Sequence, residues 1–124
     1  MSLAATANMA DVKAAALSKA TIRAAQKLGL RNRVLASVIG LSEATISRMS
    51  KDDFVLSHDS KSFELSAMFV RLFRGLDAIV GGDETVAKAW LANPNTALGD
   101  APVNLIQSVT GLVNVVQYLD SRRA

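Results

Sequence analysis

The stretch NRVLASVIGLSEATISRMSK, residues 32–51, decides the fold of the first half of this chain. Counting Asn32 as its first position, a small residue, Ala36, stands fifth, where a second helix can approach closely. Gly40 stands ninth, where the chain can turn through the left-handed conformation that glycine adopts without a Cβ clash. These constraints at this spacing are typical of two short helices that cross through a tight turn. The stretch therefore predicts a helix-turn-helix.

The other positions of the stretch divide into an inward and an outward set. Ser42 is suited to cap the second helix, because its hydroxyl can accept a hydrogen bond from a backbone N–H two or three residues on. The inward, apolar set comprises Leu35, Ile39, Leu41, Ile46 and Met49. Outward residues of the second helix in this motif face the DNA major groove, where arginine can donate to guanine and serine can pair with either base type. The outward set comprises Glu43, Ala44, Ser47, Arg48 and Lys51.

Two further arginines extend the candidate DNA surface, which also includes Ser42. Arg31 and Arg33 stand at the start of the supporting helix, where we expect them near phosphates, which position a protein without reading sequence. Glu43 opposes affinity for DNA, although a glutamate can select cytosine. The alternative is a plain helical hairpin inside a core, because alanine and glycine at this spacing also arise by chance in an alanine-rich chain.

The formal charge of the chain is unevenly divided. Residues 1–51 carry eight basic and two acidic side chains, a net charge of +6, whereas residues 52–124 carry six basic and nine acidic ones, a net charge of −3. Because a local excess of one sign attracts partners of the other, the front half is expected to meet an anionic partner and the back half a different one. The alternative is a solvated helix face that is merely rich in lysine.

The composition excludes several classes of protein. A chain of 124 residues, 50% apolar, is long enough for one compact unit and too short for two large ones, and two small subdomains that share a core are the alternative. It has no cysteine and one histidine, His58, which excludes a disulfide framework and a thiolate or histidine metal site. Because no paired carboxylates, nucleophile–base pair or phosphate-binding glycine loop is evident, we expect neither an enzyme nor a cofactor. We find no signal peptide or membrane-spanning run and expect a cytoplasmic protein.

Apolar periodicity predicts an all-α fold. Residues 10–28 form an expected first helix that Gly29 ends, and the polar residues 51–62 form a connection that holds His58. Between residues 63 and 80 the apolar positions recur every three or four residues, which predicts a long amphipathic helix at the centre of a second core, or also at a dimer surface. Start signals for three later helices are Asp83, Pro102 and Thr110.

A second stretch, AWLANPNTALGDAPVNLI, residues 89–106, is not explained by DNA binding. A tryptophan–leucine pair is followed by an asparagine–proline–asparagine turn, a leucine–glycine step and a helix opened by proline. In this order the parts resemble the toxin-binding domain of the Xre/MbcA/ParS-type antitoxins, over roughly residues 63–119. From the residues alone we expect Trp90 and Leu98 to plug a small helical bundle. Pro94, Asn95 and Gly99 would shape the turn.

The resemblance implies a cognate toxin with an ADP-ribosyltransferase-like fold that consumes or transfers from NAD. It also implies that the antitoxin's C-terminal region neutralises the toxin by covering its active-site cleft. In this chain that region is VVQYLDSRRA, residues 115–124. Family members often continue into an acidic, histidine- and glycine-containing tail, so here we expect blocking by the last helices or by tail residues. The tail candidates are Tyr118, Asp120, Ser121, Arg122 and Arg123.

These observations predict a flexible lead-in over residues 1–9, an Xre-like helix-turn-helix domain over residues 10–58 and a helical toxin-binding and oligomerisation domain over residues 59–124. The expected function is that of a type II antitoxin that neutralises its toxin and represses its own operon. Its expected partners are the toxin, operator double-stranded DNA and a second copy in a homodimer or higher assembly, with no membrane. The alternative is a dimeric helix-turn-helix regulator without a toxin partner.

Overall fold

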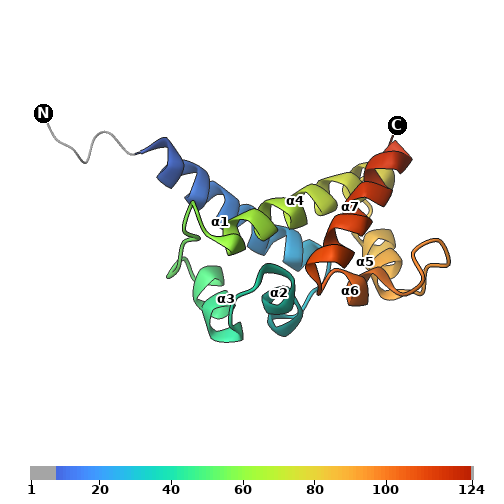
Figure 1. The fold of residues 1–124 in the computed structure, drawn as a ribbon, viewed down its shortest axis with the longest axis horizontal. Helices are drawn as coiled ribbons and strands as arrows, with labels where there is room; N and C mark the ends of the chain where they lie inside the picture. Colours follow the sequence, from blue (N-terminus) through green and yellow to red (C-terminus); the bar gives the residue numbers. More distant parts are fainter. Residues whose placement is uncertain (1–7, 124) are drawn as a thin grey trace, which may run out of the picture.

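The computed structural model describes residues 8–123, and in this range the regular structure is helical, with one isolated bridge between Asn95 and Asp100. The helices are α1 (Met9–Lys27), α2 (Asn32–Ile39), α3 (Glu43–Ser50), α4 (Lys61–Ile79), α5 (Glu84–Ala92), α6 (Pro102–Leu105) and α7 (Val109–Arg123). The all-α prediction is confirmed. In Figure 1, α1 and α4 run alongside each other, α2 and α3 lie beneath them, and α5 to α7 gather at the other end.

The first helix begins and ends at local signals in its sequence. Asn8 caps α1 by accepting a hydrogen bond from the N–H of Ala10 at 2.8 Å, and Gly29 takes a positive φ of 69° just beyond its last turn. Of the expected lead-in, residues 1–7 lie outside the described residues, and Met9 is already in the helix. Within the described part of the chain, we find no helix with the length and apolar character needed to cross a membrane.

The helix-turn-helix is present where the sequence places it. Gly40 ends α2 with a φ of 73°, and the N–H groups of Gly40 and Leu41 both donate to the carbonyl of Ala36, at 2.9 and 3.1 Å. Ser42 caps α3 by accepting from the N–H of Thr45 at 3.1 Å. Of the inward set, Leu41 is half-buried and the buried members are Leu35, Ile39, Ile46 and Met49. Both the left-handed turn and the predicted cap are therefore confirmed.

Helix α4 is the centre of the molecule. It packs against α1 and α2 of the first half of the chain and against α7 of the second half. Its fully buried Phe69, Leu72 and Leu76 belong to one apolar cluster that extends from Ala24 in α1 to Leu119 in α7. The expectation that this helix serves a second core is therefore corrected to one shared core, because its broad apolar stripe covers neighbours on two sides.

The connection between α3 and α4 is attached to the core through a serine. The hydroxyl of Ser18, buried in α1, accepts from the N–H of Leu56 at 2.9 Å and donates to the carbonyl of Ala14 at 2.7 Å. His58 lies exposed in this connection, as expected, with its ring 5.2 Å from that of Phe63. The connection is thus fixed to α1 at Leu56, although its own residues are mostly polar.

Two of the three later start signals are confirmed, and one is wrong. Asp83 caps α5 by accepting from a backbone N–H, and Pro102 opens α6. Thr110 does not cap α7, because it already lies inside that helix. The hydroxyl of Ser108 accepts from the N–H of Gly111 at 3.1 Å instead, so the helix begins earlier than predicted.

Two glycines inside helices differ in how much space a larger side chain would have. A Cβ at Gly111 would overlap the backbone carbonyl of Leu105, because α7 starts directly against the end of α6. A Cβ at Gly75, in α4, would make ordinary 3.6 Å contacts with Leu119 and Arg123 of α7. The junction of α6 and α7 therefore requires glycine, whereas the crossing of α4 and α7 accepts a methyl group.

This contrast predicts opposite effects of one substitution. Gly111→Ala should lower the free energy of unfolding by about 1–3 kcal/mol, as overpacking does. Gly75→Ala is the matched control and should leave it unchanged or raise it by up to about 1 kcal/mol, since alanine favours helix over glycine. Urea unfolding of both variants measures the difference. A Gly111→Ala protein as stable as Gly75→Ala would show that α6 and α7 do not meet this closely.

Candidate functional site

The outward face of α3 is open to solvent. Glu43, Ala44, Arg48 and Lys51 are exposed, and Ser47 is half-buried. Ser42 is also exposed, but its hydroxyl accepts the cap hydrogen bond and lies 2.8 Å from the hydroxyl of Thr45. The candidate DNA residues on this helix therefore share a face, while the side chain of Ser42 already serves the helix.

Arg48 is not a free side chain. Its Nη2 donates to the backbone carbonyl of Asp53 at 3.1 Å, its Nε lies 3.7 Å from the carboxylate of the same residue, and its guanidinium lies 5.8 Å from the ring centre of Phe54. The side chain is nevertheless 57% exposed. Reading a guanine takes two parallel N–H groups, and the contacts with Asp53 involve the Nε and Nη2 side of the guanidinium, which leaves the N–H groups of Nη1 without such a contact.

The start of α2 combines exposed basic side chains with a first turn that has no acidic residue. Arg31, at the cap position, makes no side-chain cap hydrogen bond, and Arg31 and Arg33 are both exposed. The first turn of α2 has no acidic residue, whereas those of α3 and α4 contain Glu43 and Glu64. A helix N-terminus has a partial positive charge and free N–H groups, so this one favours a phosphate.

Helix α1 contributes basic side chains beside the end of α3. Lys19, Arg23 and Gln26 of α1 line a hollow of about 340 Å³ together with Met49 and Asp52, at the end of α3. Lys19 and Arg23 were not among the DNA candidates predicted from the sequence. Their spacing of four residues places them on one helix face, and that was the available signal. Which face meets α3 is decided only by how the helices pack.

A second group of candidates gathers at the far end of the molecule. The ring of Trp90 in α5 stacks on that of Tyr118 in α7, with centroids 6.3 Å apart and planes at 18°, and the guanidinium of Arg122 lies 5.3 Å from the Tyr118 centroid. Trp90 and Leu98 are half-buried and pack against the core. They therefore close the edge of the core, as expected of a plug, while part of each stays accessible.

The turn between α5 and α6 is shaped as the sequence indicates. The side-chain carbonyl of Asn95 accepts from the N–H of Leu98 at 3.1 Å, and its backbone carbonyl accepts from the N–H of Gly99 at 2.8 Å. Gly99 has a φ of 90°, which favours glycine, and Pro94 is exposed directly after α5. Both sequence stretches that stood out thus form defined local structures.

Comparison with known families agrees with this architecture. Residues 8–71 match the antitoxin Xre-like helix-turn-helix domain, and residues 75–124 match the antitoxin Xre/MbcA/ParS C-terminal toxin-binding domain. The chain belongs to the Xre/MbcA/ParS antitoxin family. The two matches meet within α4, the helix that both halves share. Among curated proteins, no sequence matches this antitoxin.

The toxin-binding domain of this antitoxin has a hollow beside the aromatic stack. About 460 Å³ in volume, it is lined by Leu98 and Leu105 and by Asn114, Gln117 and Tyr118 of α7. Asn114 and Gln117 were not among the sequence candidates, although they precede Tyr118 by four residues and by one. Apolar walls with amide groups at the rim can hold an apolar side chain and hydrogen-bond to the backbone that carries it.

The tail candidates of the antitoxin separate onto two sides of α7. Tyr118 and Arg122 share a face with Trp90, whereas Asp120 pairs with Arg71 of α4, and Arg123 lies beside a groove between α1 and α4. The hydroxyl of Ser121 donates to the carbonyl of Tyr118 within the helix. The structure thus brings only part of the predicted tail to the aromatic face. In the described residues, no cluster of acidic or histidine side chains could hold a metal ion.

The contact between Arg48 and Asp53 yields a test of DNA reading. Arg48→Ala should weaken binding to the DNA upstream of the antitoxin's own gene by about 1–3 kcal/mol, through loss of a base contact. Asp53→Ala should tighten it, because a carboxylate leaves the DNA side and the guanidinium loses its ion pair, although its hydrogen bond to the backbone carbonyl of residue 53 remains. Asp59→Ala is the matched control, since Asp59 is an exposed acid of the same connection that contacts Ser57.

Fluorescence anisotropy over a salt series measures these affinities. In the Arg48→Ala background, the gain from Asp53→Ala should shrink, because no guanidinium remains for the carboxylate to pair with. If Arg48→Ala binds as tightly as the unaltered protein and with the same salt dependence, Arg48 holds the connection in place and does not touch DNA.

Proposed function

We propose that this antitoxin belongs to a type II system in which it neutralises a cognate toxin through its C-terminal domain and represses its own operon through α2 and α3. The observation that carries the proposal is that one core, centred on α4, supports an open basic helix-turn-helix at one end and an accessible aromatic face at the other. The two faces are formed by different helices, so operator DNA and toxin can be bound without competing for the same residues.

The DNA side is supported by charge and by helix ends. Arg31, Arg33 and the N-terminus of α2 can bind phosphates of the DNA at one point. Lys19 and Arg23 can bind the DNA backbone beside the end of α3. Between them, α3 would enter the major groove with Glu43, Ala44 and Ser47 nearest the bases. We propose that a homodimer binds two half-sites about 34 Å apart, as dimers of this motif do.

The toxin side is supported by accessible apolar surface with polar groups at its edge. We propose that a toxin side chain enters the hollow beside Tyr118 and that Asn114 and Gln117 bind the adjoining backbone. Trp90, Leu98, Tyr118 and Arg122 would surround this contact. Pro94, Asn95 and Gly99 would hold the neighbouring turn, and α7 would cover the toxin's cleft by its bulk. The family resemblance supports an NAD-consuming toxin with an ADP-ribosyltransferase-like fold.

The shared core determines how the two activities must be separated. Removing residues 1–51 would expose the α1 and α2 side of α4, and removing α7 would expose its other side. Either truncation would unfold the rest rather than isolate a domain. Substitutions at exposed residues in the intact chain are therefore the appropriate test.

The DNA prediction concerns the start of α2. Arg31→Ala and Arg33→Ala should each weaken binding to all DNA sequences alike and lower the magnitude of the salt slope by about 1, because a phosphate contact is lost. Lys61→Ala, which removes an exposed charge at the start of α4, is the matched control. Affinities for the native operator and for random DNA, across a salt series, provide the measurement. Unchanged slopes would place the phosphates elsewhere.

The toxin prediction concerns the hollow beside Tyr118. An Asn114→Arg and Gln117→Arg double variant should no longer co-purify with the toxin or rescue growth when the toxin is expressed, while its melting temperature and operator binding stay normal. The control variant Lys61→Glu should still rescue growth fully when the toxin is expressed. A double variant that still protects would place the toxin on another face. An unaltered antitoxin that neither binds a toxin nor rescues growth, yet represses its promoter, would favour the regulator without a toxin partner.

A further inference from the structure

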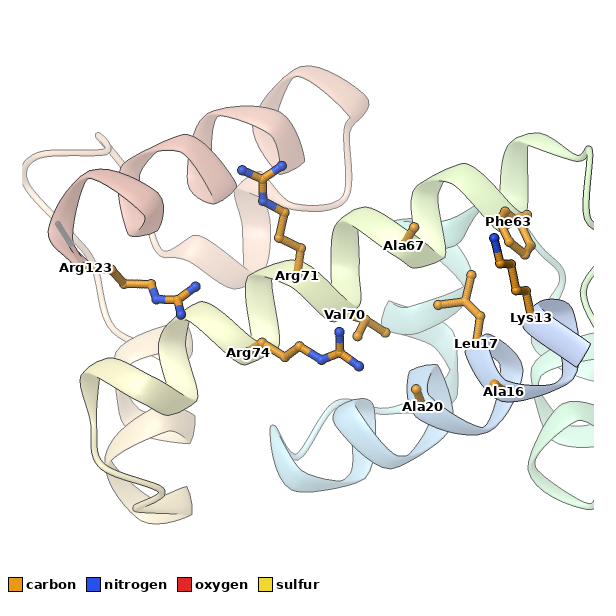
Figure 2. Close-up of a pocket in the computed structure, with 10 residues that line it drawn as sticks. All are labelled: Lys13, Ala16, Leu17, Ala20, Phe63, Ala67, Val70, Arg71, Arg74 and Arg123. Atoms are coloured by element: carbon orange, nitrogen blue, oxygen red, sulfur yellow. The ribbon is translucent and has the colours of Figure 1, made fainter.

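A groove between α1 and α4 belongs to neither of these faces. It has a volume of about 590 Å³ and is formed by one stripe of each helix, with Arg123 of α7 at one end. No residue of α2, α3, α5 or α6 lines it, so it lies on the side of the α1–α4 pair that those helices leave uncovered. Figure 2 shows Leu17, Ala20, Val70 and Arg74 between the two helices, whereas Arg71 extends toward α7.

The floor of the groove is apolar and shallow. It is formed by Ala16, Leu17, Ala20, Phe63, Ala67 and Val70. The α4 stripe spans residues 63–74, about 16 Å at 1.5 Å per residue, or three helical turns. Because alanines line much of it, another helix could lie close to both α1 and α4. The groove therefore has the length and depth for a third helix.

The rim of the groove is basic on both sides. Lys13 lies on the α1 side, Arg71 and Arg74 on the α4 side, and Arg123 at the end, and none of the described residues that line the groove is acidic. Arg71 is paired with Asp120. For Lys13, Arg74 and Arg123 we find no ion pair among residues 8–123. Three charges thus remain to pair with an occupant.

The apolar floor and the basic rim together favour one kind of molecule in the groove over the others. A second copy packed groove against groove would bring like charges together, which is unfavourable. A nucleic acid would cover the apolar floor with charged backbone. A single acyl chain would leave its outer side in water, because the groove is open along its length. An amphipathic helix places its apolar stripe on the floor and its acidic flanks at the rim.

We propose that the groove binds an acidic amphipathic α-helix of a partner protein, distinct from the DNA and toxin faces. The apolar stripe of that helix packs on Leu17 and the alanines, in the helix-in-groove manner. Carboxylates on its two flanks pair with Lys13 on one side and with Arg74 and Arg123 on the other. Recognition needs both features, since exposed ion pairs alone contribute little.

The test uses the full-length protein and a defined probe. The probe is a fluorescent 15-residue helical peptide with leucine and alanine on one face and glutamate on both flanks, and the control peptide has glutamine in place of glutamate. We expect saturable binding of the glutamate peptide and at least tenfold weaker binding of the glutamine peptide. A Lys13→Glu and Arg74→Glu double variant should bind the glutamate peptide at least tenfold more weakly than the unaltered protein. The affinity of the control variant Lys61→Glu should stay within twofold of the unaltered protein.

A second variant tests the floor without changing charge. Ala20→Phe should fill the groove and weaken peptide binding at least fivefold, and thermal melts establish that each variant is folded. The proposal is overturned if the glutamate peptide does not bind, if both peptides bind equally, or if the charge reversal has no effect. It is also overturned if sedimentation shows a dimer that the charge reversal disperses, because a second copy would then occupy the groove.

Discussion

Every surface of functional interest in this antitoxin depends on the packing of α4 against α1 and α2 on one side and α7 on the other. Phe69, Leu72 and Leu76 are buried at this junction. Burying side chains of this size stabilises a fold by roughly 1.5–3 kcal/mol each. Because the same helix supports both halves, the orientation of the helix-turn-helix relative to the aromatic face is set by one rigid element rather than by a linker.

The two candidate DNA contacts of the helix-turn-helix differ in how freely their side chains are exposed. Arg48 contacts Asp53 and Phe54, which belong to the connection that Ser18 attaches to α1. The arginine is thus held in a defined position on the surface rather than extended into water. An exposed ion pair of this kind is worth little, on the order of 0–1 kcal/mol, so it would not prevent Arg48 from making the DNA contact proposed above. The start of α2, in contrast, is open without any rearrangement.

The second sequence stretch that resembles the family has a structural role. Asn95 and Gly99 form the turn that follows Trp90, and Gly111 lets α7 begin against α6. These residues bring Tyr118 beside Trp90 although 28 positions separate them along the chain. The aromatic face therefore results from turns and close approaches, and the residues that build it need not themselves touch a partner.

Local features were predictable because local physics decides them. The left-handed turn at Gly40, the caps at Ser42 and Asp83 and the opening of α6 at Pro102 each follow from one residue's backbone preferences or side-chain hydrogen bond. The cap of α7 was misplaced because Ser108 and Thr110 are chemically similar neighbours, and only the position of α6 distinguishes them.

Contacts between distant residues were decided by the tertiary structure. Periodicity showed that α4 is amphipathic, but a stripe on a helix does not say how many neighbours it covers, so the shared core could not be read from it. The pairing of Arg71 with Asp120, and the basic groove that places Lys13 of α1 near Arg74 of α4, likewise join residues far apart in the chain. Sequence spacing determines which residues share a helix face, and only the packing of helices determines what that face meets.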